Sequence, residues 1–100
     1  HEPIPEDIMN RIKAIDKDVH IQVFVTPTCP YCPQPVAIGH RLALENGHVR
    51  ADMVEATTFP ELSQKYAVKG VPKIVINEKY DFVGSQPITI FLEVIEGIDN

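Results

Sequence analysis

The composition describes one folded domain of ordinary polarity. The chain has 100 residues, of which 44% are hydrophobic and 23% are charged, and its formal net charge is -5 at pH 7. This length suits a single domain with a modest core, and the balance of residues argues against disorder. No block of Lys or Arg points to nucleic acid, and no apolar run approaches the ~20 residues that span a bilayer.

The first residues predict an arm followed by an amphipathic helix. Residues 1–7 are rich in proline and carboxylates, and acidic side chains favour the first turn of a helix. Ile8, Ile12 and Ile15 recur at helical spacing, so a helix is predicted over residues 6–17. The chain begins at His1 rather than Met. A removed leader and a longer parent chain therefore both stay open as alternatives.

Two strands are expected around a central helix. Residues 19–25 are β-branched and largely apolar, which predicts a strand buried in the middle of a sheet. A helix is expected from Pro30 to about Asn46, and a second strand over residues 49–55. Because a helix connects them, the two strands are predicted to be parallel.

The second half predicts a short helix and then a hairpin. The stretch 57–61 is typical of a helix start, and this helix is expected to end near Val68. Residues 73–77 form a third predicted strand, and a turn over 77–79 leads into a fourth strand over 80–83. The third and fourth strands should therefore be antiparallel.

A last helix completes the predicted α/β fold. Ser85 is the expected cap, and apolar residues from Ile88 to Ile95 recur at helical spacing up to Gly97. The element order predicts a mixed sheet with helices on both faces. In such folds the active positions gather beyond the strand ends, and the first strand leads directly into the cysteines.

The two cysteines of the chain are spaced Cys-x-x-Cys at the junction of the first strand and its helix. Cys29 and Cys32 can close and reopen a small disulfide ring, whereas a structural disulfide normally constrains a longer loop. Only the thiolate attacks a disulfide, and a helix N-terminus at Cys29 would favour the anion. The spacing therefore predicts redox catalysis, in which Cys29 attacks and Cys32 resolves the mixed disulfide.

Three prolines follow Cys29 closely. Pro30 suits the first helical position, where its missing N–H would have no partner. With Cys29 as the N-cap, Pro33 and Pro35 would each remove a helical hydrogen bond. A bent helix beginning over the disulfide is therefore predicted.

The motif resembles the thioredoxin superfamily when Cys29-Pro30-Tyr31-Cys32 is taken together with Gly70-Val71-Pro72. Cys-Pro-Tyr-Cys is the redox sequence of glutaredoxins. The wider stretches 24–33, 52–56 and 71–76 resemble the C-terminal thioredoxin unit of glutaredoxin-like protein disulfide oxidoreductases of archaea and thermophilic bacteria. The N-terminal redox domain of the F component of alkyl hydroperoxide reductase is similar in pattern.

This resemblance implies one thioredoxin or glutaredoxin-like domain over residues 1–100. Its fold would be a central mixed four-stranded sheet flanked by helices, with an extra N-terminal helix. The resemblance also implies a cis peptide bond at Val71–Pro72, with the Val71 backbone pairing with an extended substrate segment. Without catalysis, Pro72 would be an ordinary proline that starts a strand. Pro30 and Tyr31 are the neighbouring substrate contacts, although Tyr31 could equally be an exposed spacer.

The sequence departs from the family pattern at two positions. Thioredoxins carry a buried Asp where this chain has Val23, so another group must handle the proton of the second cysteine. Glu55 is the candidate proton relay, with Lys73 behind it; the alternative for Glu55 is a solvated carboxylate at a strand end. Ser85 stands where glutathione-using glutaredoxins have an acidic residue, which favours protein disulfides over glutathione.

No metal or separate cofactor is expected. A Cys-x-x-Cys pair can be half of a zinc site, but the chain has no second cysteine pair, and its histidines do not fall at ligand spacing. An iron–sulfur cluster bridged between two protomers is disfavoured because Pro30 stiffens the turn after Cys29. The electrons would reside in the Cys29–Cys32 pair itself.

These observations predict a cytoplasmic thiol-disulfide oxidoreductase that acts on protein disulfides. A thioredoxin-reductase-like flavoprotein is its expected reductant, and neither nucleic acid nor membrane is an expected partner. The alternative is an electron-relay domain that serves a dedicated flavoprotein reductase or peroxidase system. The sequence leaves open the direction of electron flow, the natural substrate and the oligomeric state.

Overall fold

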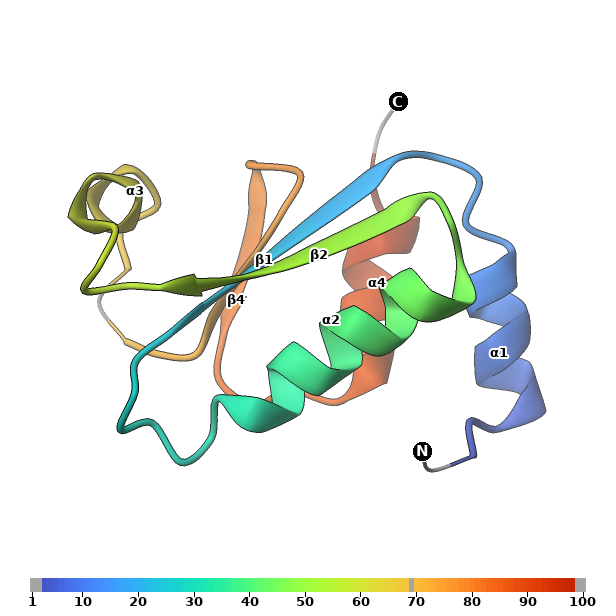
Figure 1. Cartoon of the computed structure of the whole chain (residues 1–100). Coiled ribbons are helices and arrows are strands. Elements are labelled where there is room, and N and C mark those ends of the chain that lie inside the picture. The colour runs from blue at the N-terminus through green and yellow to red at the C-terminus, as the bar shows by residue number, and fades with distance from the viewer. Residues whose placement is uncertain (1–2, 69, 99–100) are drawn as a thin grey trace.

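The computed structural model describes residues 3–68 and 70–98 of the chain. Helices and strands alternate through most of the chain, and a β-hairpin interrupts the pattern near its end (Figure 1). The elements are α1 (Glu6–Lys13), β1 (Val19–Val25), α2 (Pro33–Glu45), β2 (Val49–Glu55), α3 (Pro60–Lys65), β3 (Lys73–Ile76), β4 (Tyr80–Val83) and α4 (Ile88–Glu96). The predicted element order, including the extra N-terminal helix, is confirmed.

The four strands form one mixed sheet in the order β2-β1-β3-β4. β1 pairs in parallel with β2 over their full lengths, from Val19 opposite Val49 to Val25 opposite Glu55. β3 pairs antiparallel with both β1 and β4. The predicted central position of the first strand, its parallel partner and the final hairpin are all confirmed. The C-terminal end of β1 therefore leads toward Cys29 from the middle of the sheet.

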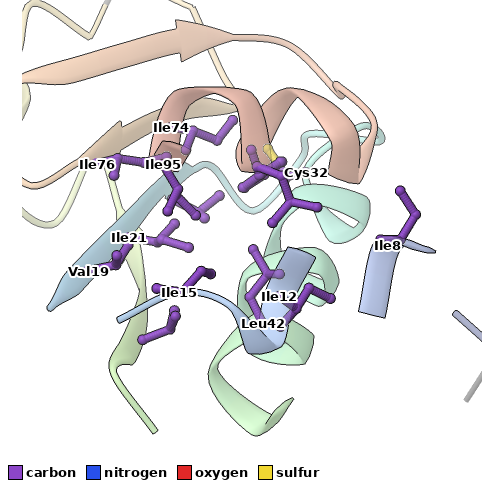
Figure 2. Close-up of a cluster of buried hydrophobic side chains, with 14 of the residues drawn as sticks. Ile8, Ile12, Ile15, Val19, Ile21, Cys32, Leu42, Ile74, Ile76 and Ile95 are labelled. Atoms are coloured by element: carbon purple, nitrogen blue, oxygen red, sulfur yellow. The ribbon is translucent and has the colours of Figure 1, made fainter. Parts of the chain in front are cut away.

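The two faces of the sheet carry separate apolar clusters. Alternate residues of β1 point to opposite faces, as strand geometry requires. The larger cluster joins the sheet to α1, α2 and α4 (Figure 2), and its buried members are Ile8, Ile12, Ile15, Val19, Ile21, Val23, Val25, Cys32, Leu42, Val49, Ile74, Ile76, Phe91, Leu92 and Ile95. The smaller cluster contains Phe24, Val54 and Val75, with Leu62, Tyr66 and Val68 packed against it. Figure 1 shows α3 apart from the other three helices.

The helices α1 and α3 end earlier than their apolar patterns predicted. α1 ends at Lys13 rather than residue 17, although Ile15 remains buried beyond the helix. Helix α3 begins at Pro60 and ends at Lys65 rather than near Val68. Ala67 adopts a left-handed φ of 52°, a conformation typical of residues just past a helix end. Ile15 is buried beyond α1, and the partly buried Val68 packs against the smaller cluster beyond α3. Apolar residues that follow each helix therefore made the predicted helices too long.

The last helix begins without the predicted serine cap. Pro87 occupies the N-cap position of α4, and Ser85 instead donates its hydroxyl to Gln34 Oε1 at 2.7 Å. This hydrogen bond joins the loop before α4 to the first turn of α2. α4 ends at Glu96 with Gly97 as its C-cap, in agreement with the predicted stop at Gly97. Among the described ranges, no helix combines the length and apolarity needed to cross a membrane.

Asn46 is a buried polar residue that ties α1 to the loop after α2. Its Nδ2 donates to the carbonyls of Ile12 and Ile15 at 2.8 and 2.9 Å, and its Oδ1 accepts from the His48 N–H at 2.8 Å. We expect Asn46→Ala to lower the free energy of unfolding by about 2–3 kcal/mol, because these backbone groups lose their partners in a buried setting.

Denaturant unfolding of Asn46→Ala and of the exposed control Asn10→Ala measures this effect. Asn10→Ala should change the midpoint little, because its side chain faces solvent. Equal midpoints for the two variants would show that the Asn46 hydrogen bonds do not stabilise the fold.

Candidate active site at the Cys29–Cys32 disulfide

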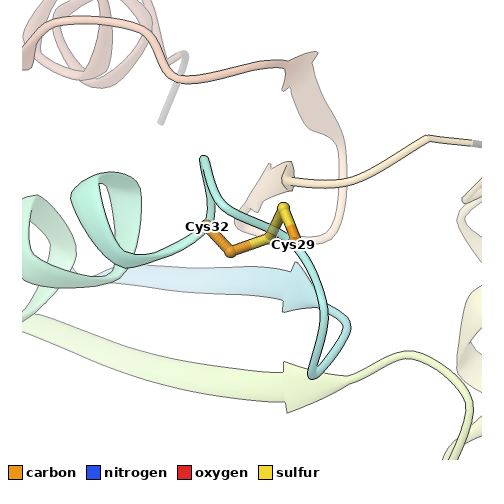
Figure 3. Close-up of a disulfide and its surroundings, with 2 residues drawn as sticks. All are labelled: Cys29 and Cys32. Carbon is orange, nitrogen blue, oxygen red and sulfur yellow. A yellow bond between two sulfur atoms is a disulfide. The ribbon is translucent and has the colours of Figure 1, made fainter.

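Cys29 and Cys32 form a disulfide on the loop between β1 and α2. Figure 3 shows it beside the C-terminal ends of β1 and β2, and the two Cα atoms are 5.5 Å apart. Cys32 is 4% exposed and belongs to the larger apolar cluster, while Cys29 is partly buried and packs against that cluster. An incoming molecule therefore reaches Cys29 more readily than Cys32.

The helix after the disulfide begins later than predicted. α2 starts at Pro33 with Cys32 as its N-cap, so neither the predicted N-cap at Cys29 nor the predicted first helical position of Pro30 is correct. At the start of a helix, Pro33 and Pro35 fall where backbone N–H groups have no helical acceptor. The later start therefore avoids the lost hydrogen bonds from which the bent helix was predicted.

This first turn offers fewer donors to a thiolate than an ordinary helix start. Pro33 and Pro35 carry no N–H, and the Val36 N–H donates to the Cys32 carbonyl at 3.3 Å. The predicted stabilisation of a Cys29 anion by first-turn N–H groups is correspondingly weaker. The first turn retains the Gln34 N–H, and the helix also contributes through the direction of its dipole.

The Val71–Pro72 peptide bond is cis, as the family resemblance implied. Pro72 is buried, and its carbonyl accepts the Gly84 N–H at 2.9 Å. Val71 packs against the same apolar cluster as Cys29. The structure therefore brings Val71 and the cysteine pair to one cluster, while the substrate-contact role of Val71 and Pro72 stays a prediction.

Pro30 and Tyr31 occupy the turn between the two cysteines. Both side chains are exposed, and Tyr31 is 68% exposed. An exposed ring beside a disulfide is compatible with a spacer and with a substrate contact. Both interpretations of Tyr31 therefore remain open.

Glu55 lies at the end of β2 and lines the same cavity as the two cysteines. The hydroxyls of Thr57 and Thr58 and the Thr58 N–H all donate to its carboxylate. These hydrogen bonds, the one from the Thr57 hydroxyl first, hold the pKa of Glu55 below its usual range. Glu55 is therefore a weaker base than an ordinary carboxylate, and its proton-relay role stays a prediction.

Lys73 does not join the cysteines. Its neighbours across the sheet are Phe24 and Val83, so its side chain shares the Phe24 face, opposite the cluster that holds Cys32. Its Nζ lies 3.5 Å from Asp81 Oδ2 and is directed to the Ala67 carbonyl. The structure therefore places Lys73 away from the disulfide, contrary to a relay behind Glu55.

Sequence reasoning missed several residues of this cavity, Met53 and His40 among them. Met53 and His40 line the space beside the disulfide together with Glu55. Met53 is 58% exposed, so much of its apolar side chain is accessible at this edge strand. Strand alternation places Met53 and Glu55 on one face of β2, and this signal was available in the sequence.

Among the described residues, no group of three or more His, Cys, Asp or Glu side chains is arranged to hold a metal ion. The redox-capable group that the fold presents is the cysteine pair. A mixed sheet with a Cys-x-x-Cys disulfide at the end of its central strand defines a thiol-disulfide oxidoreductase.

Comparison with known proteins agrees with this class. A family model described as "Thioredoxin domain" matches residues 19–96, and the chain belongs to this family. The chain is 38% identical over 68 residues to the probable thioredoxin of Archaeoglobus fulgidus, covering 66% of this chain and 74% of that protein. The thioredoxin of Methanocaldococcus jannaschii is 29% identical over 79 residues, covering 78% of this chain and 93% of that protein.

Two longer proteins are similar in structure. The F component of alkylhydroperoxide reductase (AhpF) from Enterococcus faecalis superposes with a TM-score of 0.89 at 34% identity, covering 95% of this chain and 45% of that one. A protein disulfide oxidoreductase from Aeropyrum pernix K1 gives a TM-score of 0.86 at 34% identity, covering 93% of this chain and 42% of that one. This chain thus spans less than half of either structure. The resemblance to both kinds of protein is confirmed.

Proposed function

We propose that this oxidoreductase reduces protein disulfides with Cys29 as the nucleophile and Cys32 as the resolving thiol. The difference in exposure between the two cysteines carries the assignment, because the entering disulfide must contact the attacking sulfur. Cys32, buried beneath it, is suited to act within the molecule. Glu55 is the candidate acceptor for the Cys32 proton, and water in the adjacent cavity is the alternative.

The exchange needs no reagent beyond the substrate and the reduced pair. The Cys29 thiolate attacks one substrate sulfur, forming a mixed disulfide while the other substrate sulfur leaves as a thiolate and takes a proton. The Cys32 thiolate then attacks Cys29, releasing the second substrate thiol. Two electrons pass to the substrate, and the Cys29–Cys32 disulfide remains. No separate cofactor is part of this proposal.

The contacts around the pair would hold an extended substrate segment. Val71 supplies backbone groups for strand-like pairing, Pro72 shapes the adjoining wall, and Pro30 and Tyr31 present exposed surface. Substrate proteins rather than glutathione fit this arrangement, in line with the serine at position 85. A cytoplasmic location stays part of the proposal.

Reduction of insulin by dithiothreitol, followed as turbidity, tests the activity on protein disulfides. We expect catalytic amounts of the protein to shorten the lag and raise the rate, because the Cys29–Cys32 pair relays electrons to insulin. A rate equal to that of dithiothreitol alone would contradict a general protein disulfide reductase.

A second candidate is an electron relay for a flavoprotein system, favoured by the similarity to AhpF. The same thiols would then exchange electrons with one dedicated partner. Two measurements distinguish the relay from the general reductase. One is the stopped-flow rate at which a thioredoxin-reductase-like flavoprotein reduces the oxidised cysteine pair, and the other is the rate of insulin reduction. Fast reduction with negligible insulin turnover supports the relay, whereas turnover of insulin supports the reductase.

A further inference from the structure

A cavity of about 650 Å³ opens beside the disulfide, on the side of β2. Cys29 and Cys32 contribute to its lining, and therefore the cavity is continuous with the reacting sulfur atoms. Its apolar walls come from the end of β1, the loop after it, the first half of α2 and the edge strand β2. These wall residues are Val25, Pro27, Pro33, Val36, Ala37 and Met53.

Helix α2 and strand β2, which both contribute to the cavity wall, pack closely at Gly39. A Cβ atom at Gly39 would lie 3.5 Å from the Ala51 Cβ, so the helix and β2 approach closely at this level. Nearer the start of α2, Val36 lines the cavity together with Met53 and Glu55 of β2. Met53 is 58% exposed, and β2 is the edge strand of the sheet.

Glu55 is the carboxylate among the described residues that line the cavity. A glutamate side chain is ionised at neutral pH, and the hydrogen bonds from Thr57 and Thr58 lower the pKa of Glu55 further. His40 is the other titratable side chain besides the cysteines, and none of the described lining residues is Lys or Arg. An anionic segment would therefore be repelled here, and a neutral or cationic one would be favoured.

We propose that this cavity is a docking subsite for the substrate polypeptide, in which an apolar residue flanking the substrate cysteine packs against Met53 and a nearby cationic residue pairs with Glu55. This inference rests on the proposed reduction of protein disulfides. Thiol-disulfide exchange requires the substrate sulfur to contact the Cys29 sulfur. The substrate residues on either side of that sulfur therefore lie over the protein surface next to Cys29, which includes this cavity. The exposed apolar wall and the fixed negative charge then select among substrates.

Two oxidised peptides test the subsite, each with an intramolecular disulfide and a leucine beside one cysteine. The next residue is lysine in one peptide and glutamate in the other. We expect kcat/KM to be about two- to fivefold higher for the lysine peptide, the range of one exposed charge pair. Glu55→Lys should reverse this preference, because it reverses the charge that faces the variable residue.

Met53→Ser tests the apolar wall with a third peptide, in which serine replaces the leucine. In the unmodified protein, kcat/KM for the leucine peptide is divided by kcat/KM for the serine peptide. In Met53→Ser this ratio should be about fivefold lower, because the leucine no longer packs against the Met53 side chain. Leu44→Ser is the matched control, since Leu44 is 68% exposed on α2 but does not line this cavity. Both peptide ratios should be unchanged in that variant.

The outcomes separate the subsite from the proposed function. If all peptides are reduced and neither ratio responds to Glu55→Lys or Met53→Ser, the subsite is wrong while the reductase activity stands. If the unmodified protein reduces none of the peptides, the proposed function fails, and the subsite fails with it. Shifted ratios in both variants, together with an unchanged Leu44→Ser control, support the subsite.

Discussion

Cys29→Ser is expected to reduce protein disulfide turnover to the uncatalysed rate. A serine hydroxyl is not ionised at neutral pH and does not form a disulfide, so neither the attack nor the mixed disulfide is possible. Cys32 remains in this variant, but it is 4% exposed and cannot readily reach a protein substrate. Insulin reduction under identical conditions measures the loss.

Cys32→Ser is the matched variant and should fail at a later step. Cys29 still attacks, but no resolving thiol follows, so a mixed disulfide with the substrate accumulates. Non-reducing electrophoresis and intact-mass measurement detect this adduct. The assignment of roles would be reversed if Cys29→Ser trapped the adduct and Cys32→Ser did not.

Both cysteine variants should remain folded. The disulfide closes a ring of only a few residues, and short loops give the smallest entropic stabilisation. Circular dichroism and thermal unfolding therefore serve as controls. Loss of activity with native-like spectra indicates a chemical defect, whereas unfolded variants would indicate a structural role for the pair.

Phe91→Ala should have the largest effect on stability. Phe91 is 0% exposed in α4, and its ring packs edge-on against Phe82 with the centroids 5.0 Å apart. Truncation removes a large apolar surface and leaves a cavity, at a cost of about 3–5 kcal/mol. Small domains have a total stability of roughly 5–15 kcal/mol, so a large part of it would be lost.

Chemical denaturation of Phe91→Ala beside Leu44→Ala measures this cost. Leu44 is 68% exposed, and its truncation should change the free energy of unfolding by less than about 0.5 kcal/mol. If Phe91→Ala changed the free energy of unfolding as little as Leu44→Ala, the packing of α4 against the sheet would not stabilise the fold.

The strands and their pairing were predictable because their sequences carry strong local signals. Residues 19–25 are largely apolar and rich in β-branched side chains, and the strand–helix–strand connection determines a parallel partner. The cysteine spacing likewise locates the disulfide. The cis bond before Pro72 followed from the family resemblance, since local propensity favours the trans form.

Helix ends and side-chain neighbours were less accessible from the sequence. Ile15 is buried without being helical, so periodicity alone extended α1 too far. Pro33 begins α2 instead of interrupting it, a distinction that depends on where the first helical turn forms. Lys73 follows Pro72 in sequence, but strand alternation directs it to the opposite face from Cys32.

A redox titration of the Cys29–Cys32 pair against a dithiothreitol or glutathione series tests the central claim most directly. We expect a reversible two-electron transition, within the range of about -270 to -120 mV found for related folds. A potential near the lower end indicates a reductase, and one near the upper end an enzyme that forms disulfides. If the pair showed no reversible transition, the assignment as a thiol-disulfide oxidoreductase would be contradicted.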